Sequence, residues 1–194
     1  ETMYLMVLDL KLIKKGFLIK LLIFSSLTLF SREPLELIIG QETINPGIDL
    51  TFEAAIKDTV FPSYKYGEVS ESDVHLEVIS IWSVNSPKGA KEGGFVPYLN
   101  IYAEIVNQRD NHSKTIKLLP HINLTDNFHY ALNTKLPGNI NDLFTIIFLI
   151  ESPTEGDLGI HLDWAESVGK SLTENHIFKY KNLSFERIAL SSRR

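Results

Sequence analysis

The chain has 194 residues, of which 44% are hydrophobic and 22% are charged, and its net charge is −5. This is the composition of a globular protein, and it excludes disordered, collagen-like and low-complexity chains. Because the sequence contains no cysteine, disulfides, cysteine-ligated zinc, a thiol nucleophile and lipid attachment through an N-terminal cysteine are also excluded. The acidic balance is not that of a nucleic-acid-binding protein, so we expect no nucleic acid partner.

The first 31 residues have the features of an export segment. A basic stretch, Lys11–Lys15, precedes an apolar run, Leu21–Phe30, that has the length of a signal peptide and is short for a membrane span. No A-x-A cleavage pattern precedes Arg32. We therefore predict that residues 1–31 form a signal peptide or an uncleaved N-terminal anchor helix. Residues 32–194 are then one exported domain.

Both methionines, Met3 and Met6, lie in the predicted export segment, so the predicted domain contains no sulfur. Any metal site in that domain must therefore be built from imidazole, carboxylate, carbonyl or water ligands.

After residue 34 apolar and polar residues alternate with a period of two, and turn-forming residues interrupt the pattern often. This alternation is typical of half-buried strands. A nearly continuous apolar run, Leu143–Ile150, predicts a strand covered on both faces. The predicted strands are Ile48–Ile56, Asp73–Trp82, Leu99–Ile105, Thr115–Ile122, Leu143–Ile150 and Ile177–Phe185.

Short, turn-rich connections between these strands favour an all-β fold, an antiparallel β-sandwich of the immunoglobulin-like type. No segment shows a sustained helical period. The polar stretch Phe61–Ser72 is expected to be a long surface loop.

The sequence contains six histidines but no motif of a nucleophilic enzyme and no phosphate-binding glycine loop. In a strand, residues i and i+2 point to the same face, so His75 and Glu77 are expected side by side. Taken alone, this pair also fits a histidine at the edge of the core beside an exposed glutamate.

Three further histidines, His121, His129 and His161, are placed near predicted strand ends or edges. Each alone is most often a surface or packing residue. Four histidines and a carboxylate would form a metal site if they converge, but sequence spacing does not show convergence. His112 and His176 are interpreted as surface histidines.

Several motifs, in order, resemble those of the periplasmic iron-transport and copper-binding protein family, which includes an iron-regulated Campylobacter periplasmic protein and a treponemal membrane-antigen lipoprotein. Asp73–Val78 is similar to the family's D-I-H-L-E-A segment, and Gly94–Ile101 to G-x-W-x-P-Y-L-T-I. Asp126–Asn133 is similar to D-G-P-H-Y-G-A-N, and Ile160–Lys170 to R-H-x-D-x-E-T-G-V-G-K. The resemblance covers roughly residues 36–185.

The resemblance implies an immunoglobulin-like sandwich, a homodimer, and a copper or iron site in or near the dimer interface. It implies five metal ligands in this chain, namely His75, Glu77, His121, His129 and His161. Asp126 and Asp163 are candidates for orienting a histidine, and equally for forming turns.

The main departure from the family is His121, which falls on the second Met of the family's M-P-M triplet. A thioether suits Cu(I), and imidazole makes the site harder. The expected ion is therefore Cu(II) or iron, with Zn or Mn as alternatives, in preference to Cu(I). Ile160 also replaces the family's Arg, and Ser171-Leu172 its Trp pair.

The leading hypothesis is a periplasmic metal-binding protein, not an enzyme, that serves iron uptake by handing ions to an inner-membrane iron permease. Contact with the membrane would be through residues 1–31 only, if they are not cleaved. The alternative is a surface antigen or interaction module that kept the sandwich and lost transport. A metalloenzyme is a third hypothesis, but four histidines and a glutamate leave little room for an open coordination position.

Overall fold

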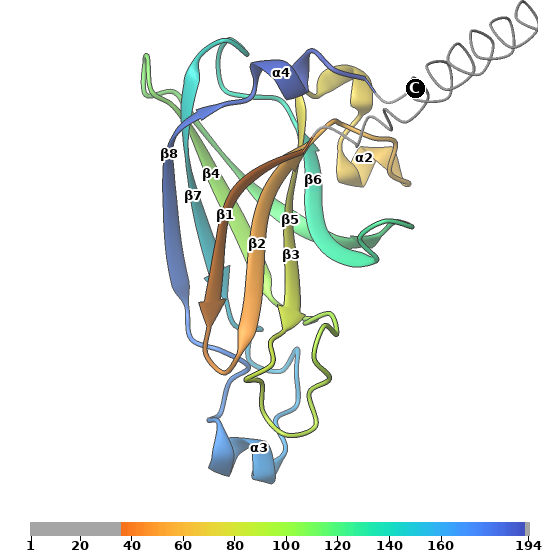
Figure 1. The fold of residues 1–194 in the computed structure, drawn as a ribbon, viewed down its shortest axis with the longest axis vertical. Coiled ribbons are helices and arrows are strands. Elements are labelled where there is room, and N and C mark those ends of the chain that lie inside the picture. Colours follow the sequence, from red (N-terminus) through yellow and green to blue (C-terminus); the bar gives the residue numbers. More distant parts are fainter. Residues whose placement is uncertain (1–35, 193–194) are drawn as a thin grey trace, which may run out of the picture. The chain divides into compact units, whose positions relative to one another are not determined.

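The computed structural model of the chain describes residues 36–192 (Figure 1). The predicted signal peptide or anchor at residues 1–31 lies outside the described residues and stays a prediction. Among residues 36–192, no helix is long and apolar enough to cross a membrane. The described strands are β1 (Glu36–Ile44), β2 (Ile48–Ala55), β3 (Val74–Trp82), β4 (Asn100–Asn107), β5 (Ser113–Ile122), β6 (Phe128–Thr134), β7 (Leu143–Glu151) and β8 (His176–Ser184).

The helical elements of residues 36–192 are short and lie outside the sheet. The β2–β3 connection carries α2 and η1. Helix α3 lies in the β7–β8 connection, and α4 follows β8 at the opposite end of the sandwich (Figure 1). Their bounds are α2 (Ser63–Tyr66), η1 (Val69–Glu71), α3 (Leu162–Ser167) and α4 (Glu186–Ala189). The expected absence of long helical periodicity agrees with these short elements.

All strand pairs are antiparallel, in the order β1-β2-β3-β6-β5-β4-β7-β8. Strand β5 belongs to both layers, because its first part pairs with β4 and its last four residues, Leu119–Ile122, pair with β6. One layer therefore contains β1, β2, β3 and β6, and the other contains β4, β7 and β8. This arrangement confirms the predicted all-β antiparallel sandwich.

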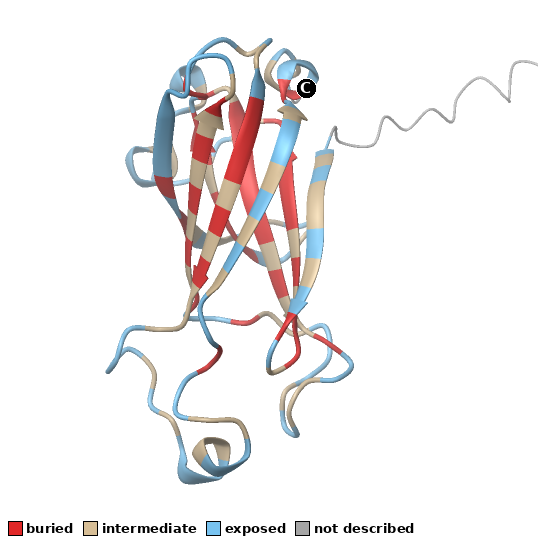
Figure 2. Ribbon diagram, turned by 90° about the vertical axis from the view of Figure 1, so that its left-hand side faces the viewer, coloured by how far each residue is buried: buried red, intermediate tan, exposed pale blue. Residues whose placement is uncertain are grey.

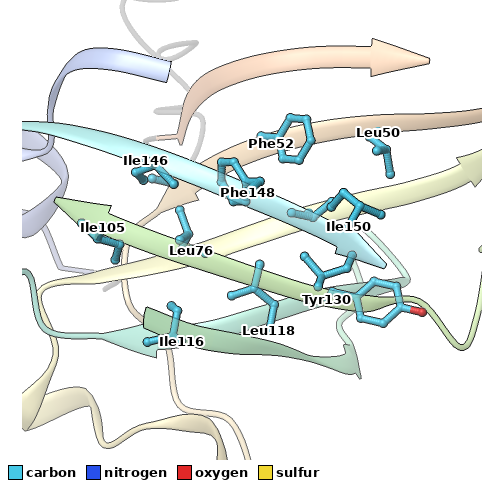
Figure 3. Packing of buried hydrophobic residues seen from close by; sticks show 14 of the residues in the cluster. Leu50, Phe52, Leu76, Ile105, Ile116, Leu118, Tyr130, Ile146, Phe148 and Ile150 are labelled. Atoms are coloured by element: carbon cyan, nitrogen blue, oxygen red, sulfur yellow. The ribbon is translucent and has the colours of Figure 1, made fainter. Parts of the chain in front are cut away.

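The core fills the space between the two layers. Phe52 of β2 and Phe148 of β7 bring side chains from the two layers together, with ring centroids 4.4 Å apart, and Leu76 and Ile105 are fully buried beside them (Figure 3). Along several strands buried and more exposed residues alternate, as the period-two pattern predicts (Figure 2). The other side chains of each strand therefore point to the outer faces of the sandwich, where polar groups can form a site.

The sheet is nearly closed, because its two edge strands β1 and β8 approach each other. The Tyr180 ring of β8 lies directly against Gly40 of β1, so that any side chain at residue 40 would overlap the ring. The Tyr180 hydroxyl donates a hydrogen bond to Glu42 Oε1 at 3.1 Å. We call this contact of Tyr180 with Gly40 and Glu42 the edge seam.

All six predicted strands are present, with ends that agree to within two residues. Two strands were not predicted, β1 and β6. The Phe61–Ser72 segment is a surface loop as expected, but it contains α2 and η1.

Candidate metal centre

Strand pairing brings the candidate ligands to one place. In β3, Leu76 and Val78 point into the core. His75 and Glu77 alternate with them along the strand and therefore point to the outer face of the sheet. Asn133 of β6 is paired with His75. The register of β5 and β6 places His121 directly opposite His129. Directly opposed residues share a face, so these polar side chains gather on the outer face of one layer.

Three histidines meet closely enough to share an ion. One nitrogen from each of His75, His121 and His129 lies within 4.8 Å of the corresponding nitrogens of the other two, and this is the one such group found among residues 36–192. The His121 and His129 ring centroids are 4.4 Å apart. We call these residues the histidine triad.

Glu77 completes the set of donors. Its Oε2 lies 3.8 Å from His75 Nε2 and 3.6 Å from His129 Nε2. Glu77 is only 3% exposed, so the expectation of an exposed glutamate beside His75 is wrong. Its cross-strand neighbour on β2 is Glu53, and His75 and His129 lie against its carboxylate. The sequence-predicted residues His75, Glu77, His121 and His129 therefore do come together.

The β2–β3 loop covers the triad from outside. The Tyr66 ring of α2 meets His121 edge-on, with ring centroids 5.3 Å apart, and its hydroxyl donates to the Pro120 carbonyl at 3.1 Å. As a result His129 is fully buried and His75 nearly so, although both are on the outer face of the sheet.

Asn133 fixes the orientation and tautomer of His75. The Asn133 amide nitrogen donates to the carbonyl oxygens of Asp58 and Gly67, at 2.6 and 3.0 Å, so its Oδ1 must act as an acceptor. That Oδ1 lies 2.8 Å from His75 Nδ1, which therefore carries the proton. His75 Nε2 then has the lone pair, and it is the nitrogen that faces Glu77.

The same logic applies to His129. Its Nδ1 lies 3.1 Å from the carbonyl oxygen of Asn127, which only accepts, so Nδ1 donates and Nε2 has the lone pair. His129 Nε2 and His121 Nδ1 are both buried without a hydrogen-bond partner. Unsatisfied buried polar atoms are uncommon and costly, and a bound cation would satisfy both at once. The donor set therefore fits a transition-metal ion.

Burial keeps the imidazoles in the neutral form that binds metal. Desolvation, followed by the nearby His129 and His75, lowers the pKa of His121 to about 4. Burial also lowers the pKa of His129. Ligand histidines must be deprotonated at the binding nitrogen, so at neutral pH these two are ready to bind an ion.

Glu77 is shifted the other way. Desolvation, followed by the negative charges of Glu53, Asp126 and Glu36, raises the pKa of Glu77 to about 8. Glu77 and Glu53 are cross-strand partners and share a hydrogen bond. This carboxyl is therefore protonated at neutral pH, and a cation at the triad would favour its ionised form.

The structure does not bring His161 to the triad of the same chain. His161 directly precedes α3, beyond the end of β3, where Trp164 packs against Trp82 with ring centroids 6.1 Å apart. Trp82 is seven positions after His75 in β3, so the two Cα atoms are about 23 Å apart at roughly 3.3 Å per residue. Residue 161 thus lies in a loop at a helix start and not at the edge of a strand near the site.

The two candidate orienting carboxylates have different surroundings. Asp163 accepts from His161 Nδ1 at 2.9 Å, but both side chains are exposed and distant from the triad. Asp126 accepts from Asn123 in the β5–β6 turn, at 2.7 Å, and its negative charge acts on His129 and Glu77. Of the remaining histidines, His112 is exposed, whereas His176 is half-buried and stacks on Phe178.

Sequence reasoning missed three residues of the site, Asn133, Tyr66 and Glu53. Asn133 had a detectable signal, because it follows His129 by four residues and thus shares its face in a strand. Glu53 and Tyr66 had none, because their approach depends on the β2–β3 pairing and on the fold of the loop.

A buried histidine triad with an adjoining carboxylate, on the outer face of an all-β sandwich, has the architecture of a metal-binding domain. Comparison with known families makes this specific. The profile of the Fe²⁺ transport protein family matches residues 34–186, and the chain belongs to this family.

Solved structures support the assignment. A copper-bound variant of P19 from Campylobacter jejuni is 26% identical, with a TM-score of 0.65 over 76% of this chain and 95% of that chain. A copper-bound variant of FetP from uropathogenic Escherichia coli shares the fold at 21% identity, with a TM-score of 0.64 over 77% of this chain and 99% of that chain. No curated protein matched the sequence.

Proposed function

We propose that this protein is a periplasmic metal-binding protein that serves iron uptake by carrying copper or iron ions to an inner-membrane permease. The observation that carries the proposal is the pair of buried, unpartnered imidazole nitrogens on His121 and His129 within the histidine triad. The proposed role is binding and release of the ion, without catalysis. The periplasmic location rests on the family and on the predicted export segment, and FetP has been expressed recombinantly in that compartment.

The chemistry of the triad favours borderline ions over soft ones. Three imidazoles and a carboxylate suit Cu(II), iron, zinc and manganese, whereas Cu(I) prefers sulfur. The domain offers no sulfur ligand, because both methionines precede residue 32. Glu77 would supply negative charge to a divalent ion and would lose its proton when the ion binds.

The test is calorimetric titration of the metal-free chain with Cu(II), Zn(II), Mn(II) and, without oxygen, Fe(II). We expect one ion per subunit to bind tightly. Because the pKa of His121 lies at about 4, its ligand nitrogen should stay neutral as the pH falls well below the usual imidazole range. If no ion binds, the proposal fails, and the alternative of an interaction module without transport replaces it.

His121→Met sharpens the assignment of the ion. The variant restores a thioether at the position where the family has one, so its affinity for Cu(I) should rise relative to Cu(II). An unchanged preference would show that residue 121 does not bind the ion.

We further propose that the chain functions as a homodimer and that His161 acts as a ligand for the other copy. His161 is exposed and does not reach its own triad, so it is available to a neighbour. Exposed apolar side chains lie at both ends such an arrangement would join, Leu124 and Phe128 on the β5–β6 hairpin and Leu162 and Val84 near α3. A two-fold dimer would let these two groups cover each other.

Sedimentation and metal titration test the dimer together. Leu124→Asp combined with Leu162→Asp should produce a monomer, and His161→Ala should weaken metal binding in the dimer while leaving the monomeric variant unaffected. A monomeric wild type, or equal effects of His161→Ala in both backgrounds, would contradict the dimer but not the triad.

A further inference from the structure

The outer face of the second layer holds a shallow cavity, widely open to solvent, that the metal centre does not use. It has a volume of about 390 Å³ and lies over β4, β7 and β8. The histidine triad lies on the outer face of the other layer, so the hydrophobic core separates the two places.

A β-bulge in β8 shapes this cavity. Phe144 pairs with Leu183 and Ile146 pairs with Tyr180, so the single residue Thr145 faces both Lys181 and Asn182. Asn182 has a φ of 59°, which completes the bulge. A bulge redirects side chains that regular alternation would send to opposite faces. Both bulge residues consequently line the cavity together with Thr145.

The charged residues that line the cavity are of one sign. Lys179 and Lys181 line it two residues apart on β8, and their Cα atoms are therefore about 6.6 Å apart. No carboxylate among the described residues lines the cavity, and neither lysine forms a salt bridge within residues 36–192. Glu104 lies on the same face, across β7 from Lys179, but outside the lining. Two lysines without a salt bridge, side by side in the lining, favour an anionic ligand.

The neutral lining groups are also placed to donate. Thr145 Oγ1 accepts a hydrogen bond from Gln108 Nε2 at 2.9 Å, so its hydroxyl hydrogen is not used in that bond. Asn111, at the β4–β5 turn, adds a side-chain amide. The floor is apolar, made by Val106 and Ile147. Donors around an apolar floor match a carbon skeleton that carries several carboxylates better than a single inorganic anion.

We propose that this cavity binds a small organic polycarboxylate, with Lys179 and Lys181 each holding one carboxylate and the Thr145 hydroxyl donating to a ligand oxygen. The site would act independently of the histidine triad, because the two lie on opposite outer faces of the sandwich.

The test is calorimetric titration of the full, metal-free chain with tricarballylate, a tricarboxylate, and in parallel with inorganic phosphate. Tricarballylate should bind saturably at one molecule per chain. Lys179→Ala combined with Lys181→Ala should weaken this binding by at least about tenfold, since charge-assisted hydrogen bonds are the strong ones. Thr145→Val, which keeps the shape of the side chain, should weaken it by a smaller factor.

The matched control is Lys88→Ala combined with Lys91→Ala, which removes the same charge from an exposed loop. This control should change tricarballylate affinity less than twofold, and metal binding should be unchanged in both double variants. An equal loss in the control would reveal non-specific attraction and overturn the proposal. Absence of saturable binding, or phosphate binding as tightly as tricarballylate, would overturn it as well.

Discussion

The same short pattern, a histidine followed two residues later by a carboxylate, occurs at His75–Glu77 and at His161–Asp163, with opposite results. In β3 both side chains are nearly fully buried, and burial raises the pKa of Glu77 to about 8. At α3 both are exposed, and the hydrogen bond from His161 lowers the pKa of Asp163. The difference teaches that the pattern has no chemical meaning until the fold supplies burial and further donors.

The largest expected effect comes from removing the buried histidines. His75→Ala combined with His129→Ala should weaken metal binding by more than about a hundredfold, because loss of an orienting partner alone costs about 10–100-fold. Calorimetric titration of the metal-free chain measures this. His112→Ala removes an exposed histidine and serves as the control, and a comparable loss there would show that ions bind the surface histidines without a defined site.

Glu77→Gln should change the pH dependence of stability. Between pH 4.5 and about 8 the folded chain keeps a proton on Glu77 that the unfolded chain has released, so the wild type loses stability as the pH rises through this window. Glutamine mimics the protonated form and does not titrate. Relative to the wild type, the variant should gain on the order of 3–4 kcal/mol between pH 5 and pH 8, at about 1.4 kcal/mol per pKa unit.

Urea unfolding of the metal-free protein at several pH values measures this gain. Asp163→Asn, which neutralises the exposed carboxylate of the other histidine–carboxylate pair, is the control for Glu77→Gln. Parallel stability profiles for wild type and Glu77→Gln would mean that Glu77 is ionised in the folded chain.

Asn133→Leu tests whether His75 depends on its orienting partner. Without the acceptor, the His75 ring is no longer held with Nε2 toward the site, and metal affinity should fall by about 10–100-fold. Asn133→Asp retains an acceptor for His75 Nδ1 but loses the donors to Asp58 and Gly67, so it should bind more tightly than Asn133→Leu. Equal affinity in the two variants and the wild type would remove Asn133 from the site.

The smallest effect is expected at the exposed pair. Asp163→Asn removes the acceptor of His161, yet the melting temperature should stay within about 1 °C of the wild type, because exposed ion pairs contribute little. Thermal unfolding by circular dichroism is sufficient. A drop of several degrees would show that α3 depends on this pair and would weaken the contrast with His75 and Glu77.

Alternation predicted the strands that have one covered face, such as β2 and β4, but it failed where another factor disturbed the pattern. In β6 both faces are covered, the inner by the core and the outer by the metal centre, so polar residues such as His129 and Asn133 are buried. In β1 a register shift between Ile38 and Gly40 interrupts the alternation.

For the site, same-face spacing within one strand was predictable, as for His75 and Glu77. The position of His121 opposite His129 depends on the register of the β5–β6 hairpin, and the remoteness of His161 depends on the helix that follows it. The resemblance to the family placed all four converging residues together, but it did not say that within one chain His161 lies beyond the far end of β3 from the triad.

The edge seam has a consequence for solubility. Open strand edges are sites at which sheets of different molecules can pair and aggregate, and proteins protect them by covering or closing them. Here the aromatic ring of Tyr180 lies over the bare backbone of Gly40, so that at this point the two edge strands cover each other. In Gly40→Ala the new methyl group would displace the Tyr180 ring from this position and uncover the backbone beneath it, and the first sign would be self-association of otherwise folded molecules.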